Sequence, residues 1–321
     1  MLTLSPTLPK RLQRPDDVPP FVITSRDVEI VRRIDDLRCL TSEQIVRALR
    51  IHEPQTSHQH VLRRLQLLFG HHYLDRPHHQ HFHVSAFAPT VYAVGREGVR
   101  LLSTATAPDP RQLWKAKKNR RITASFLRHT IETAEVMLAI EEHATRHQLH
   151  LIDHSALRPL LPVDSQTLDM PFRFRVPAQL GVQHLTIHLQ PDRVFSIAGL
   201  PDNQRLNFAL ELDRGTEQLS ARKLTHKSTF TRKIVGYDAA WRVGLYKSQL
   251  GMNGMRVLFV TTSLPRIKGM LTVQKKLIGD RLSSMFLYTT LDALNEHGPL
   301  APIWTSTQQS GISLVPHDIR A

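Results

Sequence analysis

The chain has 321 residues, of which 41% are hydrophobic and 22% charged, a composition typical of a soluble globular protein with room for two domains. No apolar run approaches the roughly 20 residues that a membrane span needs, and the single cysteine, Cys39, excludes an internal disulfide framework. The net charge of +14 attracts polyanions, usually DNA or RNA, although a charged surface also serves solubility alone.

The N-terminal sequence predicts an intracellular protein. It is rich in proline and basic residues and has no continuous apolar core of signal-peptide length. We therefore expect a cytoplasmic protein with no membrane contact, in which residues 1–20 form a disordered basic arm.

Three short helical patterns follow this arm. They begin at Ser25, Thr41 and Thr56, and the second and third carry a glutamine three residues after the threonine, as in a capping box. Two strand-like segments come next, around Tyr73 and around Val91. This order of three helices and a hairpin is that of a winged helix-turn-helix, which we predict over residues 21–110.

In a winged helix-turn-helix the third helix reads the DNA. Its outward positions here carry donors suited to phosphates and base edges, namely His58, Gln59, Arg63 and Arg64. An ordinary helical bundle is the alternative interpretation.

A basic run occupies residues 111–121 and predicts a linker that contacts phosphates. Its candidate DNA-binding residues are Lys115, Lys117, Lys118, Arg120 and Arg121. A solvated helix face is the alternative.

The second half of the chain predicts a mixed-sheet domain over residues 122–300, of α/β or α+β class, followed by a tail over residues 301–321. A long helical pattern runs from 122 to 147, and further helices start near Ser228 and after Pro265. Strand patterns lie at 148–153, 185–189, 192–198, 207–213, 256–262 and 285–290.

Acidic residues gather at the ends of two of these strands. Asp192 lies beside one strand, and Glu211 and Asp213 end the next on one face of it. Adjacent strands would bring the three carboxylates within reach of one Mg²⁺, which prefers one or two carboxylates plus water and phosphate oxygens. A solvated strand end is the alternative.

The acids and the element order resemble the PD-(D/E)XK nuclease superfamily, also called restriction-endonuclease-like. That superfamily has a lysine two residues after the second acid, a position held here by Asp213. A lysine from the following helix could replace it, and Lys223, Lys227 and Lys233 are the candidates.

A longer set of motifs resembles the replication-relaxation family of plasmid proteins. It comprises Pro191-Asp192, then ELDRGTE over residues 211–217, then Lys233 and Tyr237 in a K-x-x-x-Y pattern. The first domain is similar too, through residues 24–34, 61–65 and 92–102. The resemblance covers about residues 22–265 and implies a DNA-associated protein of a bacterial mobile element, with a winged helix followed by a nuclease-like domain.

The preferred hypothesis is a protein that binds double-stranded DNA in plasmid replication, relaxation or transfer. The first alternative is a Mg²⁺-dependent endonuclease or nickase, with Asp192, Glu211 and Asp213 as metal ligands and Lys233 orienting water or stabilising charge. The second is an inactive adaptor that recruits replication or mobilisation proteins. Arg214 would neutralise the acids or contact a phosphate. The sequence is also compatible with a homodimer.

The histidine-rich run at residues 71–83 has no cysteine partner and no defined ligand spacing, so we interpret its side chains as phosphate contacts or solvated groups. His81-Phe82-His83 also resembles the His-hydrophobic-His motif of rolling-circle relaxases. His129, beside Glu132 at the start of the long helix, faces either the core or the proposed site.

Overall fold

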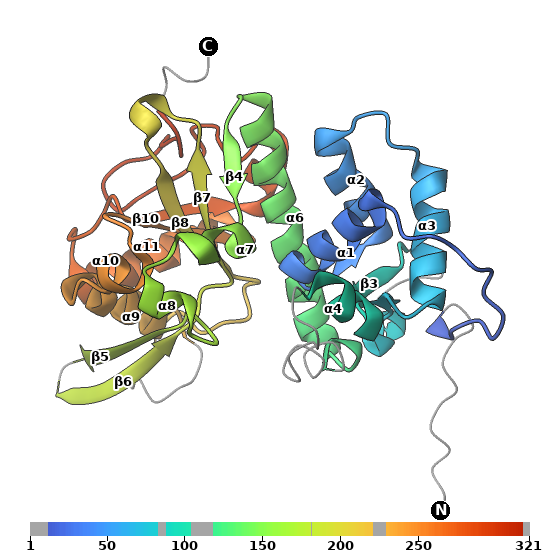
Figure 1. Ribbon diagram of the computed structural model, residues 1–321. Coiled ribbons are helices and arrows are strands. Elements are labelled where there is room, and N and C mark those ends of the chain that lie inside the picture. The colour runs from blue at the N-terminus through green and yellow to red at the C-terminus, as the bar shows by residue number, and fades with distance from the viewer. Residues whose placement is uncertain (1–11, 83–87, 104–117, 181, 221–228, 317–321) are drawn as a thin grey trace, which may run out of the picture. The chain divides into compact units, whose positions relative to one another are not determined.

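The computed structural model describes residues 12–82, 88–103, 118–180, 182–220 and 229–316. The chain is an α+β protein that divides into two compact units, Met1–Leu138 and Ala139–Ala321, with the division inside the long helix α6 (Figure 1). None of the helices in the described ranges has the length and apolar character needed to cross a membrane.

The first unit combines short helices with a three-stranded sheet. Its elements are α1 (Ser25–Leu37), β1 (Leu40–Thr41), α2 (Ser42–His52), α3 (His58–Gly70), β2 (Leu74–Asp75), the 3₁₀ turn η2 (His78–Phe82), β3 (Val91–Val94), α4 (Arg96–Leu102) and the first part of α6 (Ala124–Arg146). Strand β3 pairs antiparallel with both β1 and β2. The three predicted helices and the two strands around Tyr73 and Val91 are therefore present.

The predicted apolar stripes form the core of this unit. Val31, Ile34, Val61, Leu65 and Leu68 are all fully buried. Periodicity alone located them, because these helices are amphipathic and each turns one face to the core.

One predicted helix start is shifted by one residue. Helix α1 begins at Ser25 as predicted, with Thr24 as its cap, whereas Ser57, and not Thr56, caps α3 by accepting a hydrogen bond from the His60 amide. The capping box of Thr41 and Gln44 on α2 is confirmed.

The described part of the predicted N-terminal arm is packed. Leu12 is buried, and Arg14 forms an ion pair with Asp75 at 2.5 Å while its guanidinium lies over the Phe69 ring. The prediction of disorder is wrong for residues 12–20, because an apolar anchor and a charge pair attach this segment to α3 and β2. Residues 1–11 lie outside the described part.

The second unit is built on a mixed five-stranded sheet in the order β10-β9-β8-β7-β4. Its strands are β4 (His150–Ile152), β7 (Arg193–Ala198), β8 (Leu206–Leu212), β9 (Arg256–Thr261) and β10 (Phe286–Thr290). Its helices are α7 (His154–Leu157), α8 (Val163–Gln166), α9 (Phe230–Arg242), α10 (Leu245–Leu250), α11 (Leu264–Ile278) and α12 (Leu291–His297). Two 3₁₀ turns lie at Arg158–Leu160 and Pro201–Asn203. Strands β8, β9 and β10 run parallel, and β7 and β4 are antiparallel to their neighbours.

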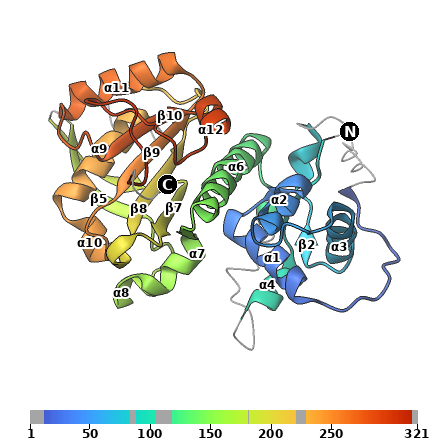
Figure 2. The same ribbon diagram turned by 90° about the horizontal axis from the view of Figure 1, so that it is seen from above.

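The connections between the parallel strands place helices on one side of this sheet. The chain passes from β8 through α9 and α10 to β9, and from β9 through α11 to β10. Right-handed crossovers between neighbouring parallel strands put these helices on the same face, and Figure 2 shows α9, α10 and α11 together there.

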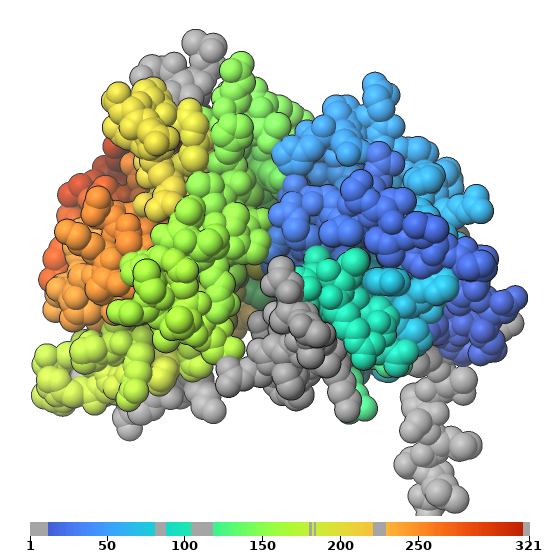
Figure 3. Space-filling view, in the orientation of Figure 1, coloured from blue at the N-terminus to red at the C-terminus, as the bar shows by residue number. Residues whose placement is uncertain are grey.

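A separate hairpin of β5 (Phe174–Leu180) and β6 (Gln183–Leu189) packs against α9. It projects from the body of the second unit (Figure 3). Strand β5 was missed by the sequence patterns. The predicted C-terminal tail is also partly packed: Thr305 bridges to Tyr288 on β10, and Trp304 is fully buried.

Candidate functional site

Strands β7 and β8 bring Asp192 and Glu211 together. Arg193 pairs with Leu210, so the antiparallel register places Asp192 opposite Glu211. The Asp192 amide donates to the Leu210 carbonyl at 3.0 Å, and its carboxylate accepts from the Leu212 amide at 2.8 Å. The backbone therefore fixes Asp192 at the end of the strand pair, where the sequence predicted one acid of the site.

Helix α9 supplies a lysine and a tyrosine to this pair of acids. Lys233 Nζ lies 3.0 Å from Glu211 Oε2 and 3.2 Å from Glu217 Oε2. The Tyr237 hydroxyl donates to Glu211 Oε1 at 2.6 Å. Lys233 and Tyr237 are one helical turn apart and so share one face of α9. The structure thus brings the predicted Lys233 to the predicted Glu211.

Glu211 is an acid with an unusual environment, since its side chain is only 1% exposed. Burial raises its pKa to about 7, helped by the charge of Asp192 and opposed by the charge of Lys233 and the hydrogen bond from Tyr237. The pKa of Lys233 is also raised: burial alone would lower it, but the charges of Glu211, Glu217 and Asp192 outweigh burial. Lys233 is therefore a fixed cation, and Glu211 is a carboxyl whose charge depends on that cation.

Asp213 does not join this cluster. Arg266 donates from Nε to its Oδ2 at 2.8 Å and from Nη2 to its Oδ1 at 2.9 Å, and the Thr261 hydroxyl donates to Oδ2 at 2.6 Å. Burial opposes ionisation of Asp213, but these hydrogen bonds outweigh burial and hold its pKa below the ordinary value. The predicted third acid is thus part of a structural ion pair, because β9 runs beside β8 and brings Thr261 to it, and α11, which follows β9, brings Arg266.

Glu217 also belongs to the site around Lys233, although the sequence patterns did not predict it there. It is the last residue of the DRGTE motif, and its carbonyl accepts a hydrogen bond from Arg266 while its carboxylate contacts Lys233. Gly215 allows this turn, since its φ of 75° is a conformation that favours glycine. Arg214 lies half-buried in the same turn.

The donor set fits a divalent cation in part. Among the described residues, no group of three or more His, Cys, Asp or Glu is arranged to hold a metal ion. Asp192 and Glu211 are two hard oxygen donors on neighbouring strands, which is the protein share of an ordinary Mg²⁺ site. Asp213 does not fit as a third ligand, since Arg266 and Thr261 already occupy its carboxylate oxygens.

The Asp213–Arg266 pair predicts a pH-dependent loss of stability. Arg266→Ala is expected to destabilise the second unit by about 3 kcal/mol at pH 7, because it removes the cation from a buried carboxylate and leaves it with the hydrogen bonds from Thr261 and from the Gly215 backbone. The lowered pKa of Asp213 means that its contribution is present above its ordinary pKa of 3.8 and is lost as the pH falls below that value. Urea unfolding at pH 7 and at about pH 2.5 measures both effects.

Lys268→Ala is the matched control for this experiment, because Lys268 is an exposed cation on the same helix. It should change stability by less than about 0.5 kcal/mol. Equal losses in the two variants would show that Arg266 does not stabilise Asp213.

In the first unit, the predicted DNA-binding side chains of α3 divide into two sets. Gln59 and Arg63 are exposed, and His58 is held near Glu43, with Nε2 and Oε1 3.0 Å apart. Arg64 differs from the prediction. Its side chain is 15% exposed and forms a bidentate pair with the fully buried Asp27, so it stabilises the contact between α3 and α1.

The basic run at residues 111–121, which belongs to the first unit, is described only in part. Lys118, Arg120 and Arg121 are exposed, and Arg120 donates to His78 at 3.1 Å. Lys115 and Lys117 lie outside the described residues, as do Lys223 and Lys227.

The described histidines make individual contacts. His71 is hydrogen bonded to the Pro19 carbonyl at 2.9 Å, and His129 lies half-buried on α6 with its ring near that of Phe126. His83, the last member of the His-hydrophobic-His motif, lies outside the described residues.

The fold and the site together define an α+β protein in which a buried glutamate, a lysine and a tyrosine meet at the end of a mixed sheet. The family model of the replication-relaxation proteins matches residues 31–255. The chain belongs to the replication-relaxation family. No curated protein and no solved structure matches it significantly.

Proposed function

We propose that the protein binds double-stranded DNA in the replication, relaxation or transfer of a plasmid or other mobile element. The order of α1, α2, α3 and the strands β2 and β3 supports a winged helix-turn-helix in the first unit. The family match to residues 31–255 supports the mobile-element context, and the net charge of +14 supports a polyanionic partner.

The observation that carries this proposal is a polar stripe on α3. Gln59, Arg63 and Gln66 are all exposed and follow each other at helical spacing, so they share one face. The Arg63 side chain makes no hydrogen bond or ion pair within the described part of the chain. An amide–guanidinium–amide stripe offers donors to phosphates and to base edges in the major groove.

The affinity of the Arg63→Ala variant for a DNA duplex tests this proposal. The variant is expected to bind more weakly than wild type, and the slope of log affinity against log salt should fall by about 1. Fluorescence anisotropy with a labelled duplex over a salt series measures both quantities.

Arg32→Ala is the control, because Arg32 is exposed on α1 and forms an ion pair with Glu29 at 2.7 Å. If the Arg63→Ala variant binds DNA with the same affinity and salt slope as the Arg32→Ala control, α3 is not the helix that reads the DNA. A wild-type protein that does not bind duplex DNA would overturn the proposed function itself.

A second function is favoured by the contact between Lys233 and Glu211. We propose that the second unit is PD-(D/E)XK-like and that Lys233 from α9 replaces the lysine missing from position 213. Asp192 and Glu211 would hold Mg²⁺, which when bound supplies charge stabilisation for a phosphoryl group. Lys233 would hold a positive charge beside that group.

A further inference from the structure

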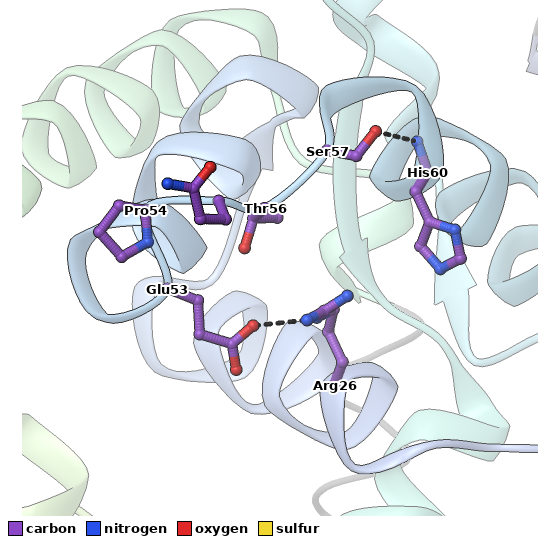
Figure 4. A pocket seen from close by; sticks show the side chains of 7 residues that line it. Arg26, Glu53, Pro54, Thr56, Ser57 and His60 are labelled. Atoms are coloured by element: carbon purple, nitrogen blue, oxygen red, sulfur yellow. Dashed lines mark hydrogen bonds and ion pairs between the residues drawn. The ribbon is translucent and has the colours of Figure 1, made fainter.

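A hollow of about 460 Å³ lies at the turn between α2 and α3. It is entirely within the first unit and is formed by the N-terminal end of α1, the turn and the first turn of α3 (Figure 4). Its lining residues are Arg26, Glu53, Pro54, Gln55, Thr56, Ser57 and His60.

Thr56 contributes a buried hydroxyl to this hollow. The residue is only 5% exposed, and its Oγ1 has no hydrogen-bond partner among the described residues. Its backbone is held firmly, because its amide donates to the Glu53 carbonyl at 2.9 Å and its carbonyl accepts from Arg50 Nε at 3.1 Å. A buried hydroxyl in a fixed backbone position is costly unless something binds to it.

The hydroxyl would be satisfied if Thr56 capped α3. Ser57 takes that role instead and accepts from the His60 amide at 3.4 Å. Thr56 is therefore left beside the hollow, and Figure 4 shows its oxygen directed toward the side where Arg26 and Glu53 lie.

Arg26 contributes a second hydrogen-bond donor to the hollow. Its Nη2 lies 2.6 Å from Glu53 Oε2, and its Nε is buried without a hydrogen-bond partner in the described part of the chain. The ion pair is solvent-exposed, with side-chain exposures of 39% and 57%. Such pairs contribute little stability, so another anion can replace Glu53 at Arg26.

Glu53 is poorly placed as a stabilising residue. It is the C-cap of α2, where the helix dipole disfavours a negative charge. The hollow thus combines two unused donors, from Thr56 and Arg26, with one carboxylate that already neutralises the arginine. Once Glu53 is displaced, the Arg26 guanidinium, which has donors and no acceptor, selects an oxyanion and not a cation.

We propose that this hollow binds a backbone phosphate of duplex DNA. Arg26 exchanges Glu53 for the phosphate, the Thr56 hydroxyl donates to a second phosphate oxygen, and the His60 ring lies at the edge of the same site. A phosphate held at the start of α3 fixes the position of that helix along the groove. The inference rests on the proposed DNA-binding function and adds a contact point that is independent of Arg63.

Thr56→Val is the decisive variant because it removes the hydroxyl and keeps the shape. Its melting temperature is expected to equal or exceed that of wild type, since the hydroxyl has no partner in the free protein. Its affinity for duplex DNA is expected to fall about tenfold, the effect of losing a hydrogen bond to a charged group. A lower melting temperature would show that Thr56 is already satisfied and would overturn the proposal.

Arg26 and Glu53 are expected to act in opposite directions. Arg26→Ala should weaken binding about tenfold and lower the salt slope by about 1, whereas the control Arg32→Ala removes one cation from the same helix outside the hollow and should change affinity less than twofold. Glu53→Gln should tighten binding about threefold, because it frees Arg26 and removes a charge that repels the phosphate.

Two further results separate this inference from its alternatives. If wild type binds duplex DNA and Arg63→Ala weakens that binding, but Thr56→Val and Glu53→Gln both bind like wild type, the phosphate site is overturned and the proposed function stands. Inorganic phosphate at matched ionic strength should leave the melting temperature unchanged. A rise that Thr56→Val abolishes would assign the hollow to a small phosphate ligand and overturn the DNA assignment.

Discussion

Replacing Lys233 with methionine is expected to destabilise the second unit by about 3–5 kcal/mol at pH 8, the usual effect of leaving a buried charge unpaired. Methionine fills a similar volume but cannot neutralise Glu211, whose side chain is 1% exposed. Among the described residues, the Tyr237 hydroxyl, at 2.6 Å, would then remain as the hydrogen-bond donor to the carboxylate. Urea unfolding followed by tryptophan fluorescence, to which the fully buried Trp304 of this unit contributes, measures the loss.

The same variant should be less destabilised at pH 5. Burial already raises the pKa of Glu211 to about 7 from an ordinary value of 4.5, although Lys233 opposes this shift. Without the lysine the folded-state pKa rises further. A carboxyl group whose pKa is higher in the folded state than in the unfolded state stabilises the fold at low pH. That contribution is lost as the pH rises from the unfolded-state pKa to the folded-state pKa. In wild type this loss ends near pH 7, whereas in the variant it continues to higher pH, so the difference in stability between the two grows from about pH 7 upward.

The double variant Glu211→Gln with Lys233→Met separates charge from packing. It removes the buried charge together with its cation, so it should recover most of the stability and lose the pH dependence. Equal destabilisation of Lys233→Met at pH 5 and pH 8 would instead show that the lysine acts through its aliphatic contacts.

Local sequence patterns predicted most elements of the fold. The stripe of Val61, Leu65 and Leu68 located α3, and the apolar run at 256–262 located β9, because both are set by periodicity within one element. Strand β5 was missed although its hairpin partner β6 was predicted, because Arg175 and Pro177 interrupt its apolar pattern. The cap of α3 was displaced by one residue, since Thr56 and Ser57 are both good caps and only the turn decides between them.

The candidate site was predictable where one strand pair or one helix face determines it. Asp192 and Glu211 meet as the strand pattern indicated, and Lys233, one of three candidate lysines and part of the K-x-x-x-Y motif, contacts Glu211. Asp213 and Arg64 were assigned functional roles, whereas each is held by a partner distant in sequence, Arg266 and Asp27 respectively. No local pattern identifies those partners, because they are brought close by the parallel pairing of β8 with β9 and by the packing of α3 on α1.

Supercoiled plasmid is expected to be nicked or cut by the wild-type protein in the presence of Mg²⁺ or Mn²⁺. Glu211→Gln, Asp192→Asn and Lys233→Met should each lower the rate on the order of a hundredfold or more, because each removes a charge placed beside the reacting phosphate. Agarose gels that resolve supercoiled, nicked and linear plasmid follow the reaction. Melting temperatures show whether each variant is folded under the assay conditions.

Asp213→Asn distinguishes this site from the one that the sequence alone predicts. Because Asp213 is held by Arg266 and Thr261, its loss should lower stability while the folded protein keeps a rate within about tenfold of wild type. A folded Asp213→Asn protein as inactive as Glu211→Gln would return Asp213 to the catalytic set. If wild type leaves the plasmid intact with every metal, the second unit is no nuclease. Its Lys233–Glu211 pair is then structural, and the unit is better explained as an adaptor that recruits replication or mobilisation proteins.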